Sequence, residues 1–296
     1  MTRRQALRAS IAAVSVGFAA LAALGPAKSA LGASSPSPDW LAGLNEHRAE
    51  AGLAPVKERR TLSAGARAHA RYLVENDALT QGEDLALPFA SPAGDRAGRN
   101  GNVAVSRDPQ HPEAAFVNAW MTSPFHALGM LRPRLSSVGF GLWSAPDGPG
   151  IRAAATLDIL SGLRHRPDGG PELLRWPGEG SVVDLRAYPG GQSPDLLTAC
   201  PGYRAPAGLP VLVAFAEPEP IAVAAISVDG APVESCLVTA DAYVNPNAEQ
   251  ERIGRALLAG DRAAAVTPRS PLPGGATVTV RLQSEHRALV WSFRTA

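Results

Sequence analysis

Apolar side chains in the first half of the chain recur at the spacing of helices. We expect one helix to begin at Asp39, whose carboxylate can cap it, and to end at Gly52. A second helix, capped by Thr61 or Ser63, carries an apolar stripe on one face. The members of this stripe are Leu62, Ala66, His69, Ala70 and Leu73. Because His69 lies on the stripe, we interpret it as a core histidine and not as a ligand.

An interrupted helix precedes the next two strands. Ser123 has the position of an N-cap residue and is followed by proline at the first helical position. The short helix that starts there carries His126 in its first turn and ends at Pro133. Alternating apolar residues predict strands over 137–143 and 151–159, which can pair as a hairpin.

No apolar period is present between residues 79 and 99, where proline and glycine recur, so this stretch is expected to be a long loop. A loop of this length in a compact domain is often functional. A short strand is expected at 102–105. The order of helix, helix, loop, helix and hairpin predicts an α+β domain over residues 39–163.

The pattern changes after residue 163 to short alternating runs between glycines and prolines. Residues 164–180 are rich in proline, glycine and charge, and are expected to form a linker. Residues 181–296 predict an all-β antiparallel sandwich. Its expected strands are 182–185, 211–215, 221–228, 233–238, 276–282 and 288–293. Residues 253–259 fit either a short helix or a further strand.

Length and composition fit two folded domains. The chain has 296 residues, of which 45% are hydrophobic, so each half can bury its own core. The formal net charge is +1; without the four basic residues of positions 1–33 it would be −3, from 24 basic and 27 acidic residues. This balance gives no reason to expect a nucleic-acid partner.

Residues 1–33 have the composition of an export signal. Arginines near the start precede an apolar run over 11–24, and small residues follow this run. The adjacent pair of arginines favours the twin-arginine route, with a general secretory signal as the alternative. The apolar run is shorter than the roughly 20 residues of a membrane-spanning helix, so we expect no transmembrane helix in the mature chain. A short polar linker, 34–38, is expected after the signal.

Cys200 and Cys236 are the only cysteines of the sequence, and both belong to the second half. In an oxidising compartment such a pair persists as a disulfide, which we expect here in preference to two buried thiols. Closing a loop of about 37 residues would stabilise this half by roughly 4 kcal/mol. Together with the export signal, the pair predicts an extracellular or cell-envelope location.

Five short motifs in the first half resemble those of a known family. They are Leu44-Asn45-x-x-Arg48-x-x-x-Gly52-Leu53-x-Pro55, Ala66-x-x-His69-Ala70-x-x-Leu73, Gly101-Asn102-Val103-Ala104, Ala119-Trp120-x-x-Ser123-Pro124-x-His126-x-x-x-Met130-Leu131 and Val138-Gly139-Phe140-Gly141. In this order and spacing, residues 40–163 resemble the CAP superfamily, also called SCP/PR-1-like, in its bacterial secreted branch. The resemblance implies a three-layer α/β/α sandwich. The last hairpin, with Trp291, resembles that of bacterial Ig-like modules, in which such a tryptophan packs between two sheets.

The resemblance also implies a central cleft, which in some relatives holds two histidines, two acidic residues and a divalent metal. Here the first histidine position falls near Thr80 and Gln81, and the acidic positions fall on Gly101 and Ser123. Only His126 occupies a ligand position of the family. A zinc site needs about three or four protein ligands, so we expect neither a metal nor another cofactor unless nearby loops supply the rest. The loop residues that could do so are Glu83, Asp84, Asp95 and His111.

His126, Ser123 and Asn102 are the candidates for ligand contact in this cleft. In the alternative interpretation, His126 hydrogen-bonds locally and packs against Trp120. Ser123 and His126 occupy the N-cap and third positions of one helix, where the hydroxyl is better used on a backbone N–H. No acid is placed to orient the imidazole, so a pair of nucleophile and base is not expected.

The sequence therefore favours a secreted or envelope-associated binding or structural protein without catalytic activity. Its partner would be a small molecule, a lipid or a component of the cell envelope. Two alternatives remain, a metal-assisted hydrolase acting in the cleft and a carrier of small lipidic ligands.

Overall fold

The computed structural model describes residues 38–147, 150–164 and 171–296. Residues Ser37–Ala296 form a compact unit by themselves. The expected export signal and nearly all of the polar linker after it lie outside the described residues. Within the described residues, none of the helices combines the length and the apolar character needed to cross a membrane.

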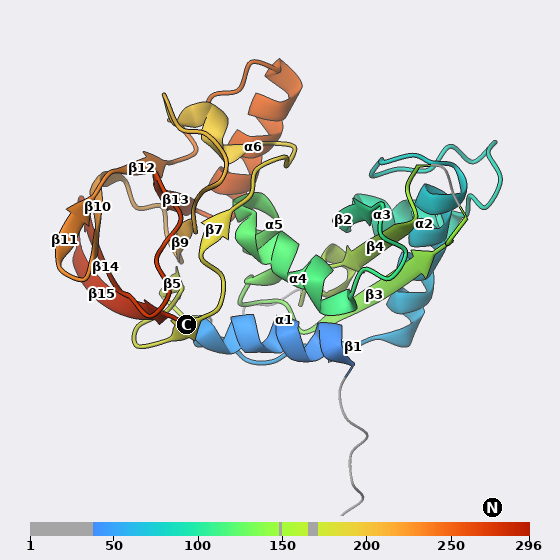
Figure 1. The fold of residues 1–296 in the computed structure, drawn as a ribbon, viewed down its shortest axis with the longest axis horizontal. Coiled ribbons are helices and arrows are strands. Elements are labelled where there is room, and N and C mark those ends of the chain that lie inside the picture. The colour runs from blue at the N-terminus through green and yellow to red at the C-terminus, as the bar shows by residue number, and fades with distance from the viewer. Residues whose placement is uncertain (1–37, 148–149, 165–170) are drawn as a thin grey trace, which may run out of the picture. The chain divides into compact units, whose positions relative to one another are not determined.

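A four-stranded sheet lies at the centre of the first half (Figure 1). Among the described residues its strand order is β1 (Lys57–Glu58), β3 (Ser137–Ser144), β4 (Ala153–Asp158) and β2 (Gly101–Ser106). β3 and β4 pair antiparallel, which confirms the hairpin expected from their alternating pattern. β2, which includes the strand expected at 102–105, pairs antiparallel with the other side of β4.

Helices cover both faces of this sheet. They are α1 (Asp39–Glu50), α2 (Arg60–Glu75), α3 (Pro92–Arg99), α4 (Glu113–Thr122) and α5 (Pro124–Met130). Trp40 of α1 and Trp120 of α4 are buried in the same core as Leu157 of β4. Leu73 of α2 packs in a second core with Ala154, the side chain of which points to the opposite face of β4. The first half thus has the layers of helix, sheet and helix that we expected.

Two helix starts differ from the sequence expectations. Asp39 is the first helical residue of α1 and Pro38 occupies the N-cap, so the expected Asp39 cap is wrong. α2 begins at Arg60, and neither Thr61 nor Ser63 caps it. The Ser63 hydroxyl instead donates a hydrogen bond to Glu58 Oε1 at 2.7 Å, which links the helix to β1.

The helix α3 interrupts the loop that was expected over residues 79–99. Ser91 caps it by accepting a hydrogen bond from Gly94 N at 3.0 Å. Its sequence, PAGDRAGR, contains no large apolar residue. It packs closely on α2, since a Cβ at Gly65 would lie 2.9 Å from Ala93 O. A helix that packs through its backbone leaves no apolar period for sequence analysis to detect.

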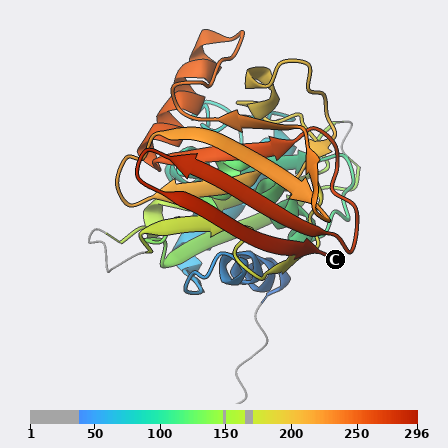
Figure 2. The same ribbon diagram turned by 90° about the vertical axis from the view of Figure 1, so that its left-hand side faces the viewer.

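Two β-sheets and a helix form most of the second half (Figure 2). In the part of the chain that the structure describes, a five-stranded sheet has the order β11-β10-β14-β15-β6 and a four-stranded sheet has the order β12-β13-β9-β5. β7 (Ala187–Tyr188) pairs separately with β8 (Ala207–Gly208). The other bounds are β5 (Leu173–Trp176), β6 (Val182–Val183), β9 (Val211–Phe215), β10 (Ile221–Val228), β11 (Ala231–Val233), β12 (Ser235–Val238), α6 (Ala248–Gly260), β13 (Ala263–Pro268), β14 (Thr277–Ser284) and β15 (Ala288–Thr295). Both sheets are open, and side chains from both share one core.

Alternation predicted some of these strands and missed others. β9, β10, β14 and β15 lie where they were expected. The strand expected at 233–238 is divided at Glu234 into β11 and β12, which belong to different sheets. β5 lies inside the expected linker and has only four residues, three of them apolar, and β13 is buried along its whole length. The sequence of neither strand therefore alternates between apolar and polar residues as that of a half-buried strand does. Residues 253–259 belong to the helix α6.

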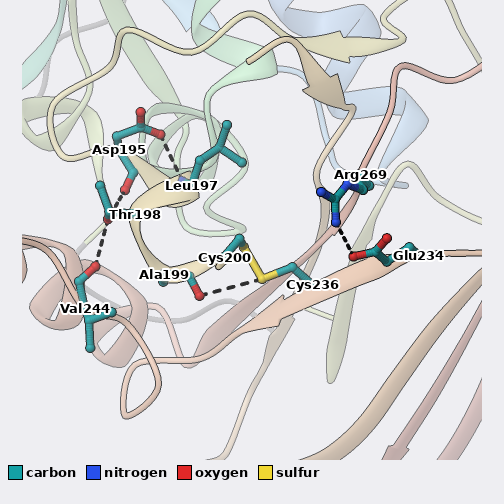
Figure 3. The surroundings of a disulfide bond; sticks show 9 residues. All are labelled: Asp195, Leu197, Thr198, Ala199, Cys200, Glu234, Cys236, Val244 and Arg269. Carbon is teal, nitrogen blue, oxygen red and sulfur yellow. Dashed lines mark hydrogen bonds and ion pairs between the residues drawn. A yellow bond between two sulfur atoms is a disulfide. The ribbon is translucent and has the colours of Figure 1, made fainter. Parts of the chain in front are cut away.

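Cys200 and Cys236 form the expected disulfide, with their Cα atoms 5.8 Å apart (Figure 3). Cys200 follows the 3-10 helix η2 (Leu196–Ala199), and Cys236 lies in β12. β12 is an edge strand of its sheet. The disulfide therefore fixes a loop to the edge of the four-stranded sheet.

Contacts between the two halves join them within the compact unit. The Phe125 ring of α5 packs edge-on against Tyr243, with ring centroids 5.3 Å apart. Trp176 Nε1 of β5 donates a hydrogen bond to Glu50 Oε2 of α1 at 2.8 Å. Buried residues of both halves belong to the same hydrophobic core. The division into domains at 39–163 and 181–296 stays a prediction from the sequence.

Candidate functional site

A cavity of about 600 Å³ lies beside the N-terminal part of β2 and the helix α5. Its wall on this side includes Asn102 and His126. The opposite wall comes from the second half of the chain, through residues 191–194 and the helix α6. The cavity is therefore built from segments that are far apart in the sequence.

His126 lies in the first turn of α5, as the sequence predicted, and its side chain is only partly exposed. Burial lowers its pKa to about 4, although a hydrogen bond with Gln192 opposes this shift. The imidazole is therefore neutral at neutral pH. Its Nδ1 is buried and has no hydrogen-bond partner among the described residues. A neutral imidazole donates from one nitrogen and accepts at the other, so the hydrogen-bonding capacity of Nδ1 is unused in this structure.

Asn102 and Ser123 have different relations to the cavity. Asn102 is buried in β2, lines the cavity, and donates a hydrogen bond from Nδ2 to the His126 carbonyl oxygen at 3.3 Å. Ser123 occupies the N-cap of α5 but makes no capping hydrogen bond, so the expected use of its hydroxyl is wrong. Its Oγ is buried without a partner among the described residues, and Ser123 is not among the residues that line the cavity. The structure thus brings Asn102 and His126, but not Ser123, to the cavity wall.

Carboxamide side chains line the cavity in a way that the sequence analysis missed. Gln81, Asn100, Gln192 and Gln250 contribute to its wall together with Asn102. Gln250 Oε1 is buried without a hydrogen-bond partner among the described residues. No sequence motif connects these residues. Gln81 lies in the loop after α2, Asn100 and Asn102 lie just before and in β2, Gln192 precedes η2, and Gln250 belongs to α6. Only the fold brings them together.

The remaining wall is largely apolar, and its charged groups are already paired. Arg99 donates to Asp95 Oδ1 at 3.0 Å, and Arg132 donates to Asp261 Oδ1 at 2.7 Å. The apolar side chains of the wall include those of Leu79, Val103, Phe125, Ile159, Ile253 and Leu257. None of the residues that line the cavity in the described structure is an aspartate or a glutamate.

The residues present do not fit a metal ion at His126. Among the described residues, no group of three or more histidine, cysteine, aspartate and glutamate side chains could hold one. Glu83, a candidate ligand, is instead hydrogen-bonded to the buried His69 at 3.0 Å. Asp95 is paired with Arg99, and the His111 ring packs edge-on against Phe116. The remaining candidate, Asp84, accepts a hydrogen bond from Ala86 N at 3.0 Å.

The buried state of His69 confirms its interpretation as a core histidine. Its side chain is fully buried, with Nδ1 hydrogen-bonded to Glu83 and Nε2 to the carbonyl oxygen of Thr80 at 3.1 Å. Both ring nitrogens are therefore occupied. The same contacts attach the loop after α2 to the body of the sheet and helices.

The first half is a layered α+β domain with a cavity beside β2 and α5. Residues 41–155 match the CAP family, described as the cysteine-rich secretory protein family. The chain therefore carries a CAP domain, also called an SCP domain, over these residues. The 1.5 Angstrom resolution crystal structure of an extracellular protein containing a SCP domain from Bacillus anthracis str. Ames is similar at 16% identity and a TM-score of 0.31. The similarity covers 43% of this chain and 45% of that chain, which is less than half of either. No curated protein matches the chain.

Proposed function

We propose that this chain is an exported CAP-domain protein that binds a small uncharged ligand in the cavity beside His126 and does not catalyse a reaction. The observation that carries the proposal is the lining of this cavity, which combines apolar side chains with carboxamides and a neutral imidazole. Ligand sites of this size are commonly apolar with a few placed polar groups that fix the orientation of the ligand. The absence of a carboxylate from the described lining disfavours a cationic ligand.

Two side chains of the cavity wall each contain a buried polar atom without a partner among the described residues. His126 Nδ1 and Gln250 Oε1 are both buried without a hydrogen-bond partner among the described residues. Leaving a buried polar atom unpaired costs about 1–3 kcal/mol. A ligand with a hydroxyl or amide group beside an apolar body would recover this cost if the two side chains turned these atoms toward the cavity.

The surroundings of His126 support a binding role over a catalytic one. A general base works best with a pKa near the working pH, whereas the pKa of His126 is lowered to about 4. A hydrogen bond with Gln192 opposes this lowering of the His126 pKa. Gln192 is a neutral amide, however, and cannot stabilise an imidazolium as a carboxylate would. Ser123, the nearest hydroxyl in sequence, is not on the cavity wall.

The location of the protein is part of the same proposal. The disulfide between Cys200 and Cys236 fits an oxidising compartment outside the cytoplasm. Residues 1–33 have the composition of an export signal, with a basic start and an apolar run.

We also propose that the two sheets of the second half are an Ig-like sandwich, with Trp291 buried in the core that they share.

A cavity-filling substitution tests the binding proposal. Gly129 lies in α5 and lines the cavity, and a Cβ there would meet only Ile159, at 3.4 Å. Gly129→Leu should therefore fill the cavity without disturbing the helix. The control is Gly43→Leu in α1, because a Cβ at Gly43 meets nothing within 4 Å.

The measurement is a titration of the compact unit Ser37–Ala296 with N-phenyl-1-naphthylamine, an uncharged apolar fluorophore. We expect saturable binding by the parent chain and by Gly43→Leu, and binding weakened about tenfold or more by Gly129→Leu, since its side chain takes the volume that the probe needs. Equal affinities of Gly129→Leu and the parent chain, or no saturable binding by the parent, would refute the proposal.

A further inference from the structure

Large apolar side chains are exposed along the loop between α2 and α3. The exposed fractions are 64% for Leu79, 62% for Leu85, 43% for Leu87 and 44% for Phe89. Single exposed apolar residues are normal on protein surfaces, but a cluster of them commonly marks an interaction site. In Figure 1 this loop is the teal segment that projects beyond α2.

Two side chains, those of Glu83 in the loop and Asn76 before it, hold the loop in place. Glu83 accepts hydrogen bonds from the backbone N of Ser91 at 2.6 Å and pairs with the buried His69. Asn76 at the end of α2 donates from Nδ2 to the carbonyl oxygen of Pro88 at 2.9 Å. The loop is thus fixed through Glu83 and Asn76, with its large apolar side chains in solvent beside the exposed Asp84 and Gln81.

Phe89 has an unusual backbone conformation that belongs to this arrangement. Its φ is 62°, in the left-handed region that bulky side chains rarely adopt. Such strain is maintained only where surrounding contacts fix it, and it is commonest at functional sites. The exposed position of the ring is therefore set by the fold and is not a frayed end.

Exposed arginines and a tryptophan lie next to the apolar loop. The Arg71 guanidinium lies 4.2 Å from the ring centroid of Phe89 and 4.9 Å from that of Trp143. Arg67, one turn earlier on α2, lies 5.1 Å from the Trp143 ring. Glu75 contacts both Arg71 and Trp143 Nε1, and the other exposed acidic groups close in sequence are Asp77 and Asp84. Leucine and phenylalanine at the tip, with arginine and tryptophan beside them, are the residue types that enter the boundary between lipid tails and head groups.

We propose that the loop of residues 79–91 docks this protein onto the surface of a lipid bilayer, with Leu85, Leu87 and Phe89 inserted and with Arg67 and Arg71 at the level of the head groups. A projecting loop can enter a fluid apolar layer, whereas a protein partner would need a matching pocket. Leu79 belongs both to this loop and to the cavity wall, so docking places one side of the cavity near the lipid. The inference rests on the loop itself and does not depend on the ligand proposed for the cavity.

Vesicle sedimentation of the compact unit Ser37–Ala296 tests the proposal. This unit contains the described elements and lacks the expected export signal, the apolar run of which would bind lipid by itself. The vesicles are made of phosphatidylcholine alone or of phosphatidylcholine with phosphatidylglycerol. We expect the parent chain to bind both, more tightly when the anionic lipid is present. The double substitution Leu85→Asp with Leu87→Asp should weaken binding about tenfold or more, since the inserted apolar area is lost.

The matched control is Val244→Asp, because Val244 is 47% exposed in a loop of the second half. It should bind vesicles as the parent chain does. Trp143 provides a second readout, since the other four tryptophans are buried and its fluorescence should shift to the blue only when the loop inserts. Thermal unfolding checks that the double variant is folded, as its altered side chains are exposed. A parent chain that binds neither vesicle, or a double variant that binds as the parent does, overturns the proposal.

Discussion

The fold shifts the pKa values of two histidines in opposite directions. His126 is held neutral because burial lowers its pKa to about 4, with Gln192 opposing the shift. Burial also lowers the pKa of His47, but hydrogen bonds with Glu50 and Asn118 and the charge of Glu50 outweigh it, so this pKa is raised above its usual 6.5. The His47 nitrogens lie 2.9 Å from Glu50 Oε2 and 3.0 Å from Asn118 Oδ1. A protonated imidazole donates to both oxygens.

The stability of the protein should therefore depend on pH through His47. Because its pKa is higher in the folded than in the unfolded state, its stabilising contribution is complete below pH 6.5 and is lost as the pH rises through the folded-state pKa. The free energy of unfolding of Ser37–Ala296 minus that of its His47→Gln variant, measured in urea from pH 5.5 to 9, should show this decrease, whereas the lowered pKa of His126 makes the stability of each protein alone rise through pH 6.5. The pH dependence of the difference between the two proteins isolates His47 from the other groups. A constant difference would show that the charge of His47 is not linked to folding.

Elements that pack through large side chains could be predicted from the sequence, and those that pack through the backbone could not. The apolar stripe of α2 and the alternation of β3 and β4 revealed these elements, although the first residue of α2 was misplaced. α3 packs through glycine and alanine, and β13 is buried along its whole length. Neither element therefore shows a periodic pattern of apolar residues. Of the candidate site, Asn102 and His126 could be predicted, because motifs carry them. Gln192 and Gln250 could not, because only the fold of the second half places them at the cavity.

The helix α2 packs closely on β3 because glycines of β3 face it. The sequence contains these glycines, but their role is visible only in the structure. A Cβ at Gly141 would collide with the backbone of Arg67 in α2, and one at Gly139 with the backbone of Leu62. The contacted atoms belong to a helix backbone, so a rotamer change cannot relieve the collision. Glycine at these positions therefore sets the distance between helix and sheet.

Gly141→Ala should lower the free energy of unfolding by about 2–4 kcal/mol, because α2 would have to move away from β3. Gly43→Ala in α1 is the control, since a Cβ there meets nothing within 4 Å, and it should be neutral or stabilising by up to about 1 kcal/mol. Both free energies can be measured by urea unfolding. A loss below about 0.5 kcal/mol in Gly141→Ala would mean that the helix and strand are less tightly packed than the structure indicates.

In the whole compact unit, the second half of the chain completes the cavity that borders the first half. The CAP domain supplies Asn102 and His126, and residues 191–194 with α6 supply the opposite wall of the cavity. Arg132, two residues after α5, donates two hydrogen bonds to Asp261, which directly follows α6, at 2.7 and 3.0 Å. This ion pair fixes the position of α6 relative to α5, and so the width of the cavity between them.

Arg132→Met should reduce the free energy of unfolding by about 2 kcal/mol, because it leaves the partly buried Asp261 carboxylate unpaired. Arg269→Met is the control, since Arg269 pairs with Glu234 in an exposed position, where such a pair contributes at most about 1 kcal/mol. A double-mutant cycle with Asp261→Asn separates the ion pair from other effects. Equal losses in Arg132→Met and Arg269→Met would argue against a role for the pair in joining the two halves.

The most direct test of the central claim, that His126 lines a binding cavity and not a metal site, is the metal content of the protein. The compact unit Ser37–Ala296 and its His126→Ala variant would be saturated with zinc and desalted. The number of zinc ions per chain would then be measured by inductively coupled plasma mass spectrometry. We predict far less than one ion per chain in both proteins, because a single imidazole lacks the other ligands that a zinc site needs. A stoichiometric ion that is lost in His126→Ala would contradict the account.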